Sequence, residues 1–368
     1  MASKRYDKIN ALIRKWEKEG QDINILRGIY GSCNLEESDL VDRSEDLKHG
    51  TNYTNFSQEE FVNLFKADKF SALNKTQLKH LFQELHNRYI KDKGYDVTRN
   101  VAVVDDKTVS AYGYVCSGND LMFINKASID KAKMVEPEKN NFNKTNIGYS
   151  LLYVISHESQ HVAQFENSID YMIGDKKLDS EMAFLAAMTT IENANMAVDD
   201  ATNNPEFLFN WKSHYDYQFI EHNANYSAFK KAKEMIPDSE KKGKAYNQYD
   251  AFTTLLALRD TPSLTRDSKE FIADRVAKME EFAKYEIEFF EKNTADCPIK
   301  QKLLETAHSF IKVDENGNSP FRNKLNREIG EMVDVCKNAR MELFKDKKNN
   351  KKNTSNKKAS DDEFLPQL

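Results

Sequence analysis

Long hydrophobic runs are missing from this sequence. No stretch approaches the roughly 20 consecutive apolar residues that a membrane-spanning helix requires. The amino terminus, MASKRYDKINALIRKWEKEG, is charged throughout and lacks the apolar segment that is typical of a signal peptide. We therefore expect a cytoplasmic protein with no membrane partner.

Paired cysteines are missing as well. The four cysteines lie far apart in the sequence and form no CxxC motif; they are Cys33, Cys116, Cys297 and Cys336. A disulfide framework or a zinc knuckle requires a closer, paired spacing. We therefore expect reduced thiols and neither of those two structures.

The chain also lacks an excess of basic charge. Its formal net charge is -5, and its lysines are spread among aspartates and glutamates. A nucleic-acid-binding protein should show a basic face, so we expect no nucleic-acid partner. The 368 residues, of which 39% are hydrophobic and 31% charged, are typical of a soluble globular protein with a core of ordinary size.

Four segments follow one another along the chain. Residues 1–58 are polar and contain one short amphipathic helix. Residues 59–238 mix helical patterns with strand patterns, whereas residues 239–344 look helical throughout. Residues 345–368 have almost no apolar content and should be disordered. Together these patterns predict an α+β fold that is mostly helical.

Strand patterns are confined to one part of the second segment. They follow two predicted helices, of which the first is capped by Ser57 and the second ends at Gly94. Residues 97–106 and 109–128 are rich in Val, Tyr, Phe and Ile. The turn sequence SGND, residues 117–120, interrupts the second of these ranges. We expect a small antiparallel sheet of two or three strands, in which the last two form a hairpin.

A polar loop then leads into a long helix, predicted over residues 147–166, that carries the sequence HESQH. His157 and His161 lie at positions i and i+4, one turn apart on the same helix face. Two imidazoles at that spacing can bind one tetrahedral zinc ion. Glu158 stands beside the metal without ligating it, so it can accept a proton from water and later give it to a leaving amine. This HExxH motif predicts a zinc-dependent hydrolase.

A purely structural explanation competes with this interpretation. A short motif arises by chance in some sequences, and two histidines on an ordinary core helix can be buried and hydrogen-bonded. The surrounding sequence favours a buried helix that no proline or glycine interrupts between residues 149 and 166. Its apolar positions are Leu151, Leu152, Val154, Ile155, Val162 and Phe165.

The order of the elements resembles the zincin metallopeptidases over roughly residues 60–235. A helix, a strand pair ending AYGYVCSGNDLMFIN and an HExxH helix follow one another. The resemblance implies Zn²⁺ as cofactor and an edge strand that binds extended peptide beside the metal. Residues 112–114 (Tyr-Gly-Tyr) and 123–125 (Phe-Ile-Asn) fall where such a strand would lie. The chain resembles the gluzincins in particular, in which a glutamate on a later helix completes the site, and it lacks the third histidine of the metzincins.

Glu221 is the favoured third ligand. The sequence EHNANYSA that it begins resembles the ExxANxxA signature of a gluzincin-like group, in which the glutamate binds metal. Ala224 and Ala228 lie at i+3 and i+7 from Glu221, on its own helix face. These small residues would let that helix pack closely on the HExxH helix.

Other acids remain alternatives. Glu181 follows His161 at a spacing that resembles the thermolysin-type arrangement, but the bulky Leu185 lies on its helix face. Glu166 and Glu192 are further candidates, and Glu166 is disfavoured because it follows on the same helix as the two histidines.

Several other polar residues have both a functional and a structural interpretation. His222, Tyr217 and Tyr226 could donate to a transition-state oxyanion, or could be a surface histidine and two core aromatics. Residues 314–318 (DENGN) resemble the start of a calcium loop, but the required later glycine and glutamate are missing, so we expect a polar turn.

Three functional hypotheses follow from the sequence. The first is a zinc metallopeptidase that acts on a peptide or protein substrate with Glu158 as general base. The second is a non-catalytic interaction or structural protein that retains a zincin scaffold and binds a protein partner through its C-terminal helices. The third is a helical structural protein of a mobile element in which the motif is fortuitous. The intact Glu158 favours the first, because a structural metal site does not need a general base.

Overall fold

The structure is a computed structural model that describes eleven segments of the chain. They are residues 3–23, 25–26, 53–95, 99–105, 107–108, 112–115, 121–128, 141–174, 177–203, 205–264 and 267–352. The fold is mostly helical and has a small three-stranded mixed sheet, so the predicted α+β class with a majority of helix is confirmed. The predicted turn at residues 117–120 lies outside the described residues.

The N-terminal part of the described chain contributes two short and two longer helices, which have between 5 and 18 residues. Leu12 and Trp16 of the predicted amphipathic helix are buried. The predicted cap at Ser57 is present, since its hydroxyl accepts from the backbone N–H of Glu60 at 3.3 Å and the Glu60 carboxylate accepts from the Ser57 N–H at 2.8 Å. The helices are α1 (Ser3–Glu19), α4 (Gln58–Asn63), α5 (Ala67–Ser71) and α6 (Lys75–Asp92).

The sheet has the strand order β1-β3-β2, with β1 (Asn100–Val104), β2 (Gly113–Val115) and β3 (Leu121–Asn125). Strand β3 pairs antiparallel with β2, as expected for a hairpin, but parallel with β1. The sheet is therefore mixed, and the antiparallel sheet that the sequence predicted is wrong. Apolar alternation shows which face of a strand is buried, but it does not show which strand will lie beside it.

This order decides which strand lies at an edge. Strand β2 pairs only with β3 among the described strands, so Gly113 and Tyr114 do lie on an edge strand. Residues 123–125 lie instead on the central strand β3. Their predicted place at an edge is wrong, because the hairpin inserts β3 between the other two strands.

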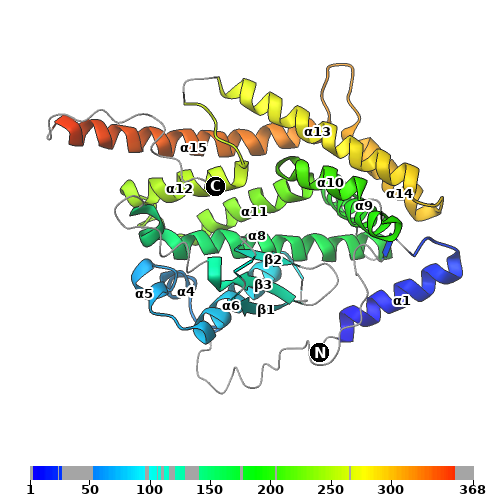
Figure 1. Ribbon diagram of the computed structural model, residues 1–368, viewed down its shortest axis with the longest axis horizontal. Helices are drawn as coiled ribbons and strands as arrows, with labels where there is room; N and C mark the ends of the chain where they lie inside the picture. The colour runs from blue at the N-terminus through cyan, green and yellow to red at the C-terminus, as the bar shows by residue number, and fades with distance from the viewer. Residues whose placement is uncertain are drawn as a thin grey trace.

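Helix α8 (Asn141–Ile173) runs through the middle of the molecule, as Figure 1 shows. It is longer than the predicted helix and begins inside the stretch that we expected to be loop. The sheet and α4 to α6 lie on one side of it, and the later helices lie on the other. Gly148 permits a close approach on the first side, because a Cβ atom there would lie 2.0 Å from the carbonyl oxygen of Phe65.

Helices make up the rest of the described chain. Asn203 ends α9 in a left-handed conformation with φ 51°. The elements are α9 (Ser180–Thr202), α10 (Glu206–Ser213), the 3-10 turn η2 (Tyr215–Tyr217), α11 (Phe219–Met235), α12 (Gly243–Leu258), α13 (Ser268–Asn293), α14 (Pro298–Ile311) and α15 (Pro320–Lys352).

The C-terminal helices share one hydrophobic core with the rest of the described chain. That core extends from Leu12 in α1 to Cys336 in α15, and α12 packs on both α8 and α15. The segment boundaries expected after residues 58 and 238 stay predictions. Helix α15 runs to Lys352, past residue 345 where the disordered tail was expected to begin, and residues 353–368 lie outside the described residues.

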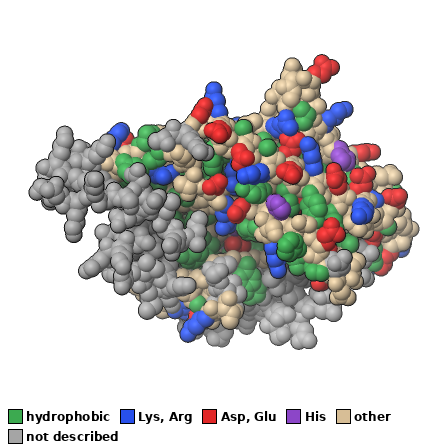
Figure 2. All heavy atoms as spheres, turned by 45° about the horizontal axis from the view of Figure 1, so that its top comes forward, with side chains coloured by type: hydrophobic (Ala, Val, Ile, Leu, Met, Phe, Trp, Pro, Cys, Tyr) green, Lys and Arg blue, Asp and Glu red, His purple; other side chains and the backbone are tan. Residues whose placement is uncertain are grey.

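The surface carries charges of both signs. Figure 2 shows Lys and Arg side chains interspersed with Asp and Glu side chains over the face that comes forward from the top of Figure 1. None of the helices in the described ranges is long and apolar enough to cross a membrane. Cys297 and Cys336 are buried and free, whereas Cys33 and Cys116 lie outside the described residues.

Candidate metal centre

Helix α8 presents His157 and His161 on the same face. Their Nε2 atoms lie 3.1 Å apart, and the two rings meet edge to face. Nδ1 of His161 lies 2.9 Å from Oε1 of Gln164. The Gln164 amide nitrogen donates to the carbonyl of Ile220 and to Oδ1 of Asn223, which fixes Oε1 as the atom facing His161. Nδ1 of His161 therefore carries the proton, and its Nε2 keeps a lone pair for a ligand.

Helix α11 places Glu221 against the two histidines. Its Oε1 lies 3.4 Å from Nε2 of His161, and its Oε2 lies 3.5 Å from Nε2 of His157. Ala224 and Ala228 are fully buried, as the proposed close packing of this helix requires. Helix α11, which carries the ExxANxxA-like sequence, thus brings Glu221 to the HExxH motif.

Buried amide hydrogen bonds hold α11 in register with α8. Gln160 donates to Oδ1 of Asn223 at 2.8 Å, and the Tyr153 hydroxyl donates to Oδ1 of Asn225 at 2.6 Å. Both asparagines belong to the sequence EHNANYSA. Buried polar groups must find partners, so these bonds specify one relative position of the two helices.

The three side chains fit a tetrahedral zinc ion. Bonds of about 2.0–2.1 Å place two ligand atoms of a tetrahedron about 3.3 Å apart. The two histidine Nε2 atoms, 3.1 Å apart, agree with that value, and each of them has one Glu221 oxygen at a similar distance, Oε1 at 3.4 Å from His161 and Oε2 at 3.5 Å from His157. Oε2 of Glu221 is buried and accepts no hydrogen bond from the described residues, which favours a cation in contact with it. Within the described ranges, this is the one group of three such residues whose ligand atoms all lie within 4.8 Å of one another.

Electrostatics favour the ligating forms of these groups. Burial lowers the pKa of His157 to about 4, so this imidazole is neutral at pH 7 and can bind metal. Burial by itself would raise the pKa of Glu221, but the neighbouring His161 and His157 outweigh burial and lower that pKa to about 2. The carboxylate is therefore ionised over the whole physiological range of pH.

Glu158 lies between the metal centre and the edge strand. Its Cγ atom is 3.1 Å from the position that a Cβ atom would take on Gly113 of β2. Burial, together with the charge of Glu221, raises the pKa of Glu158 to about 8. A carboxyl group with a pKa near neutrality can accept and return a proton during one reaction cycle.

Two residues at this centre escaped the sequence analysis. The Tyr215 hydroxyl in η2 approaches the Glu221 carboxylate as a hydrogen-bond donor, and burial raises its pKa above the ordinary value. The guanidinium of Arg259, at the end of α12, lies over the Tyr215 ring at 5.5 Å from the ring centre. Neither residue belongs to a recognisable motif, and no signal in the sequence could have identified them.

The alternative ligands lie elsewhere. Glu181 on α9 has a half-exposed side chain and forms an ion pair with Lys324 at 2.5 Å. Glu192 is buried but accepts a hydrogen bond from the Trp211 indole at 3.0 Å. Neither of these acids, nor Glu166, belongs to the cluster of ligand atoms.

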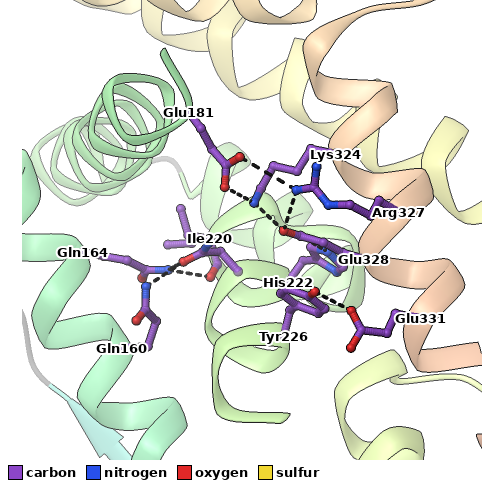
Figure 3. A network of polar contacts seen from close by, with 11 residues as sticks. Gln160, Gln164, Glu181, Ile220, His222, Tyr226, Lys324, Arg327, Glu328 and Glu331 are labelled. Atoms are coloured by element: carbon purple, nitrogen blue, oxygen red, sulfur yellow. Dashed lines mark hydrogen bonds and ion pairs between the residues drawn. The ribbon is translucent and has the colours of Figure 1, made fainter. Parts of the chain in front are cut away.

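The candidate oxyanion donors have other contacts, and Figure 3 draws two of them, His222 and Tyr226, beside acids of α15. His222 is buried against Oε2 of Glu328 at 3.1 Å, so its interpretation as a surface residue is wrong. Tyr226 donates to Glu331 on α15 at 2.7 Å. Tyr217 lies beneath the Arg275 and Lys278 side chains, each 5.4 Å from its ring centre.

The same view explains how α11 is held from two sides. Gln160 and Gln164 reach it from α8, and the acids of α15 reach it from the opposite side (Figure 3). Lys324 bridges Glu328 and Glu181 and so joins α15 to α9. The helix that carries Glu221 is therefore fixed by polar contacts on both faces.

The turn expected at residues 314–318 is present. The Asp314 carboxylate accepts from the backbone N–H groups of Asn316 and Asn318, and Gly317 has a positive φ of 80°. This side chain caps the polar turn that the sequence predicted.

No protein family, no curated protein and no solved structure was found to match this chain. What the site can do must therefore follow from its geometry.

Proposed function

We propose that the chain is a zinc-dependent metallopeptidase. The observation that carries this proposal is the convergence of His157, His161 and Glu221 beside Glu158. Two imidazoles and one carboxylate, with a second carboxylate left free of the cluster, match the usual catalytic pattern of three protein ligands and a separate general base.

Each residue has a distinct task in this proposal. A zinc ion held by the three ligands lowers the pKa of water and polarises the substrate carbonyl. Glu158 accepts a proton from the attacking water and returns it to the leaving amine when the C–N bond breaks. Gln164 keeps His161 in the tautomer that leaves Nε2 free.

The edge strand β2 supplies a place for an extended peptide. It has a strand partner on one side only among the described residues, and it passes close to Glu158 at Gly113. A peptide that pairs with such an edge gains backbone hydrogen bonds regardless of its sequence. Its scissile bond would then lie near the general base, which supports a peptide as the substrate.

The arrangement also supports the resemblance to gluzincins. An HExxH helix, an edge strand beside it and a later helix carrying a glutamate are the parts that this resemblance implies. The alternative of a non-catalytic protein with a zincin scaffold does not explain why a buried carboxyl group with a raised pKa stands beside the ligand cluster.

Dependence of peptide cleavage on metal tests the proposal. The purified protein is incubated with a mixture of short peptides, and new amino termini are identified by mass spectrometry. We expect cleavage by the zinc-loaded protein, its loss after treatment with a chelator and its return when zinc is added. Absence of cleavage by protein that holds stoichiometric zinc would leave the non-catalytic alternative, and absence of zinc binding would favour a fortuitous motif.

A further inference from the structure

Arg259 has an unusual backbone conformation for its residue type. It follows α12 with φ 52° and ψ 17°, and its N–H bonds the carbonyl of Leu255 at 2.9 Å. Glycine is favoured at this position of a helix end, because the left-handed region is unfavourable for residues with a Cβ atom. Arg259 and Asn203 are the non-glycine residues with positive φ in the described part of the chain. Residues held in such conformations cluster at functional sites.

The Arg259 side chain also has a buried donor without a partner in the described chain. Its Nε is buried, and no described residue accepts a hydrogen bond from it. Nε of Arg275 is also without a partner among the described residues, but that side chain donates through Nη2 to the carbonyl of Asp216, and Arg340 donates through Nη1 to the carbonyl of Pro262. A guanidinium offers five donors, and leaving them unused in a partly buried place is unfavourable. A ligand with acceptor oxygens would satisfy them.

The guanidinium belongs to the surroundings of the metal centre. It interacts electrostatically with Glu158, His157 and Glu221, and it lies over the ring of Tyr215, whose hydroxyl approaches Glu221. An acceptor bound to Arg259 would therefore lie next to the reacting peptide bond.

A count of charges indicates what kind of acceptor fits. When Glu158 is ionised and ready to accept a proton, Glu158 and Glu221 contribute two negative charges, whereas a zinc ion and Arg259 contribute three positive ones. A neutral peptide leaves this surplus of one positive charge in place, and so does a proton that moves from water to Glu158. A substrate group with a single negative charge removes the surplus. The planar fork of a guanidinium matches a carboxylate in particular.

We propose that Arg259 binds a substrate carboxylate next to the scissile bond, so that the enzyme prefers peptides with a carboxylate at that position. The carboxylate belongs either to the C-terminus of the peptide or to an Asp or Glu side chain. This inference rests on the proposed peptidase function, which provides the substrate that Arg259 selects.

Peptide binding without turnover tests the inference. Zinc-loaded Glu158→Gln protein is titrated by calorimetry with acetylated tripeptides in three forms: free acid, C-terminal amide, and C-terminal amide with a glutamate side chain. We expect at least one carboxylate form to bind about tenfold more tightly than the uncharged amide, because hydrogen bonds to charged groups are strong. The form that binds best identifies the source of the carboxylate.

Variants at position 259 distinguish the effect of the guanidinium from the effect of the left-handed backbone conformation. Arg259→Gly removes the guanidinium and suits the left-handed conformation, so the variant should fold with at least the stability of the parent. It should bind acid and amide forms equally, whereas Arg259→Lys should keep part of the preference. Asn203→Gly is the matched control, since it makes the same backbone change and should leave the preference intact.

Two results would overturn the inference. One is an unchanged preference for a carboxylate form of the peptide when Arg259→Gly is added to the Glu158→Gln protein. The other is the absence of such a preference in the Glu158→Gln protein that retains Arg259. The binding measurement does not depend on cleavage, so it tests the role of Arg259 alone. Failure of the peptidase proposal has a different result: zinc-loaded protein with an intact Glu158 would cleave no peptide.

Discussion

Glu221 lies with its Oε1 atom 3.4 Å from Nε2 of His161, although α9, α10 and a 3-10 turn separate their helices in the chain. This relationship completes a set of three ligand atoms that neither helix provides alone. It also separates Glu221 from the rival Glu181, which is paired with Lys324.

We predict that Glu221→Gln weakens zinc binding by at least about tenfold, because a neutral amide replaces an anionic ligand. Glu181→Gln should bind zinc with the affinity of the parent. Competition with a chromogenic chelator measures both constants. Loss of zinc in Glu181→Gln with normal binding in Glu221→Gln would show that the third ligand was assigned to the wrong helix.

We predict that Gln164→Ala lowers zinc affinity by about 10- to 100-fold, since His161 loses the acceptor that holds its Nδ1–H. Gln160→Ala is the control, because Gln160 bonds Asn223 and Tyr89 but neither histidine. It should change zinc affinity by no more than a few-fold. Equal losses in the two variants would mean that the orientation of His161 is not what Gln164 contributes.

Gly148→Ala should destabilise the fold by about 3 kcal/mol or more, because the added Cβ would overlap the carbonyl of Phe65 and would force α8 away from it. Gly330→Ala on α15 is the matched control. Its nearest neighbour is the end of the Ile272 side chain at 3.8 Å, so it should stabilise the helix by about 0.5–1 kcal/mol. Urea unfolding measures both changes, and a neutral Gly148→Ala would contradict the close packing of α8.

Glu192 should make stability depend on pH. Burial raises its pKa from 4.5 to about 8, and burial together with Glu192 raises the pKa of Glu286 on α13 well above its ordinary value. The folded state therefore holds the proton of Glu192 more tightly than the unfolded state does. The resulting stabilisation is fully present below pH 4.5, the ordinary pKa, and is lost as pH rises through about 8. The free energy of unfolding of the parent should therefore fall between about pH 5 and pH 9.

The variant Glu192→Gln isolates this effect. The substituted side chain cannot ionise but can still accept from the Trp211 indole, so the decline with pH should be shallower. Near pH 9 the variant should exceed the parent by at least about 1 kcal/mol, the scale of an unsatisfied buried charge. Parallel curves for parent and variant would contradict a buried, protonated Glu192.

The local parts of the candidate site could be read from the sequence. His157 and His161 are one helical turn apart, so helix geometry alone brings their rings together. Glu221 could be proposed because EHNANYSA resembles the ExxANxxA signature, and the small Ala224 and Ala228 that permit close packing on its face are both buried. The first inference depends on spacing within one helix, whereas the second depends on that resemblance.

Residues that reach the site through tertiary packing could not be predicted in the same way. Tyr215 lies in a short 3-10 turn that packs on α11 and α13, and Arg259 lies at the end of α12, which packs on α8 and α11, so the position of each depends on tertiary packing. The burial of His222 could not be predicted, because its partner Glu328 lies far along the chain on α15. The parallel pairing of β1 with β3 escaped prediction for the same reason.

The comparison of Glu158→Gln with the parent protein tests the central proposal most directly. Zinc content is measured on both proteins by mass spectrometry of the metal, and hydrolysis is measured on a peptide that the parent cleaves. We predict one zinc per chain in both and a loss of hydrolysis by several orders of magnitude in the variant, because the ligands remain while the general base is removed. Equal turnover by both proteins would contradict the proposed mechanism.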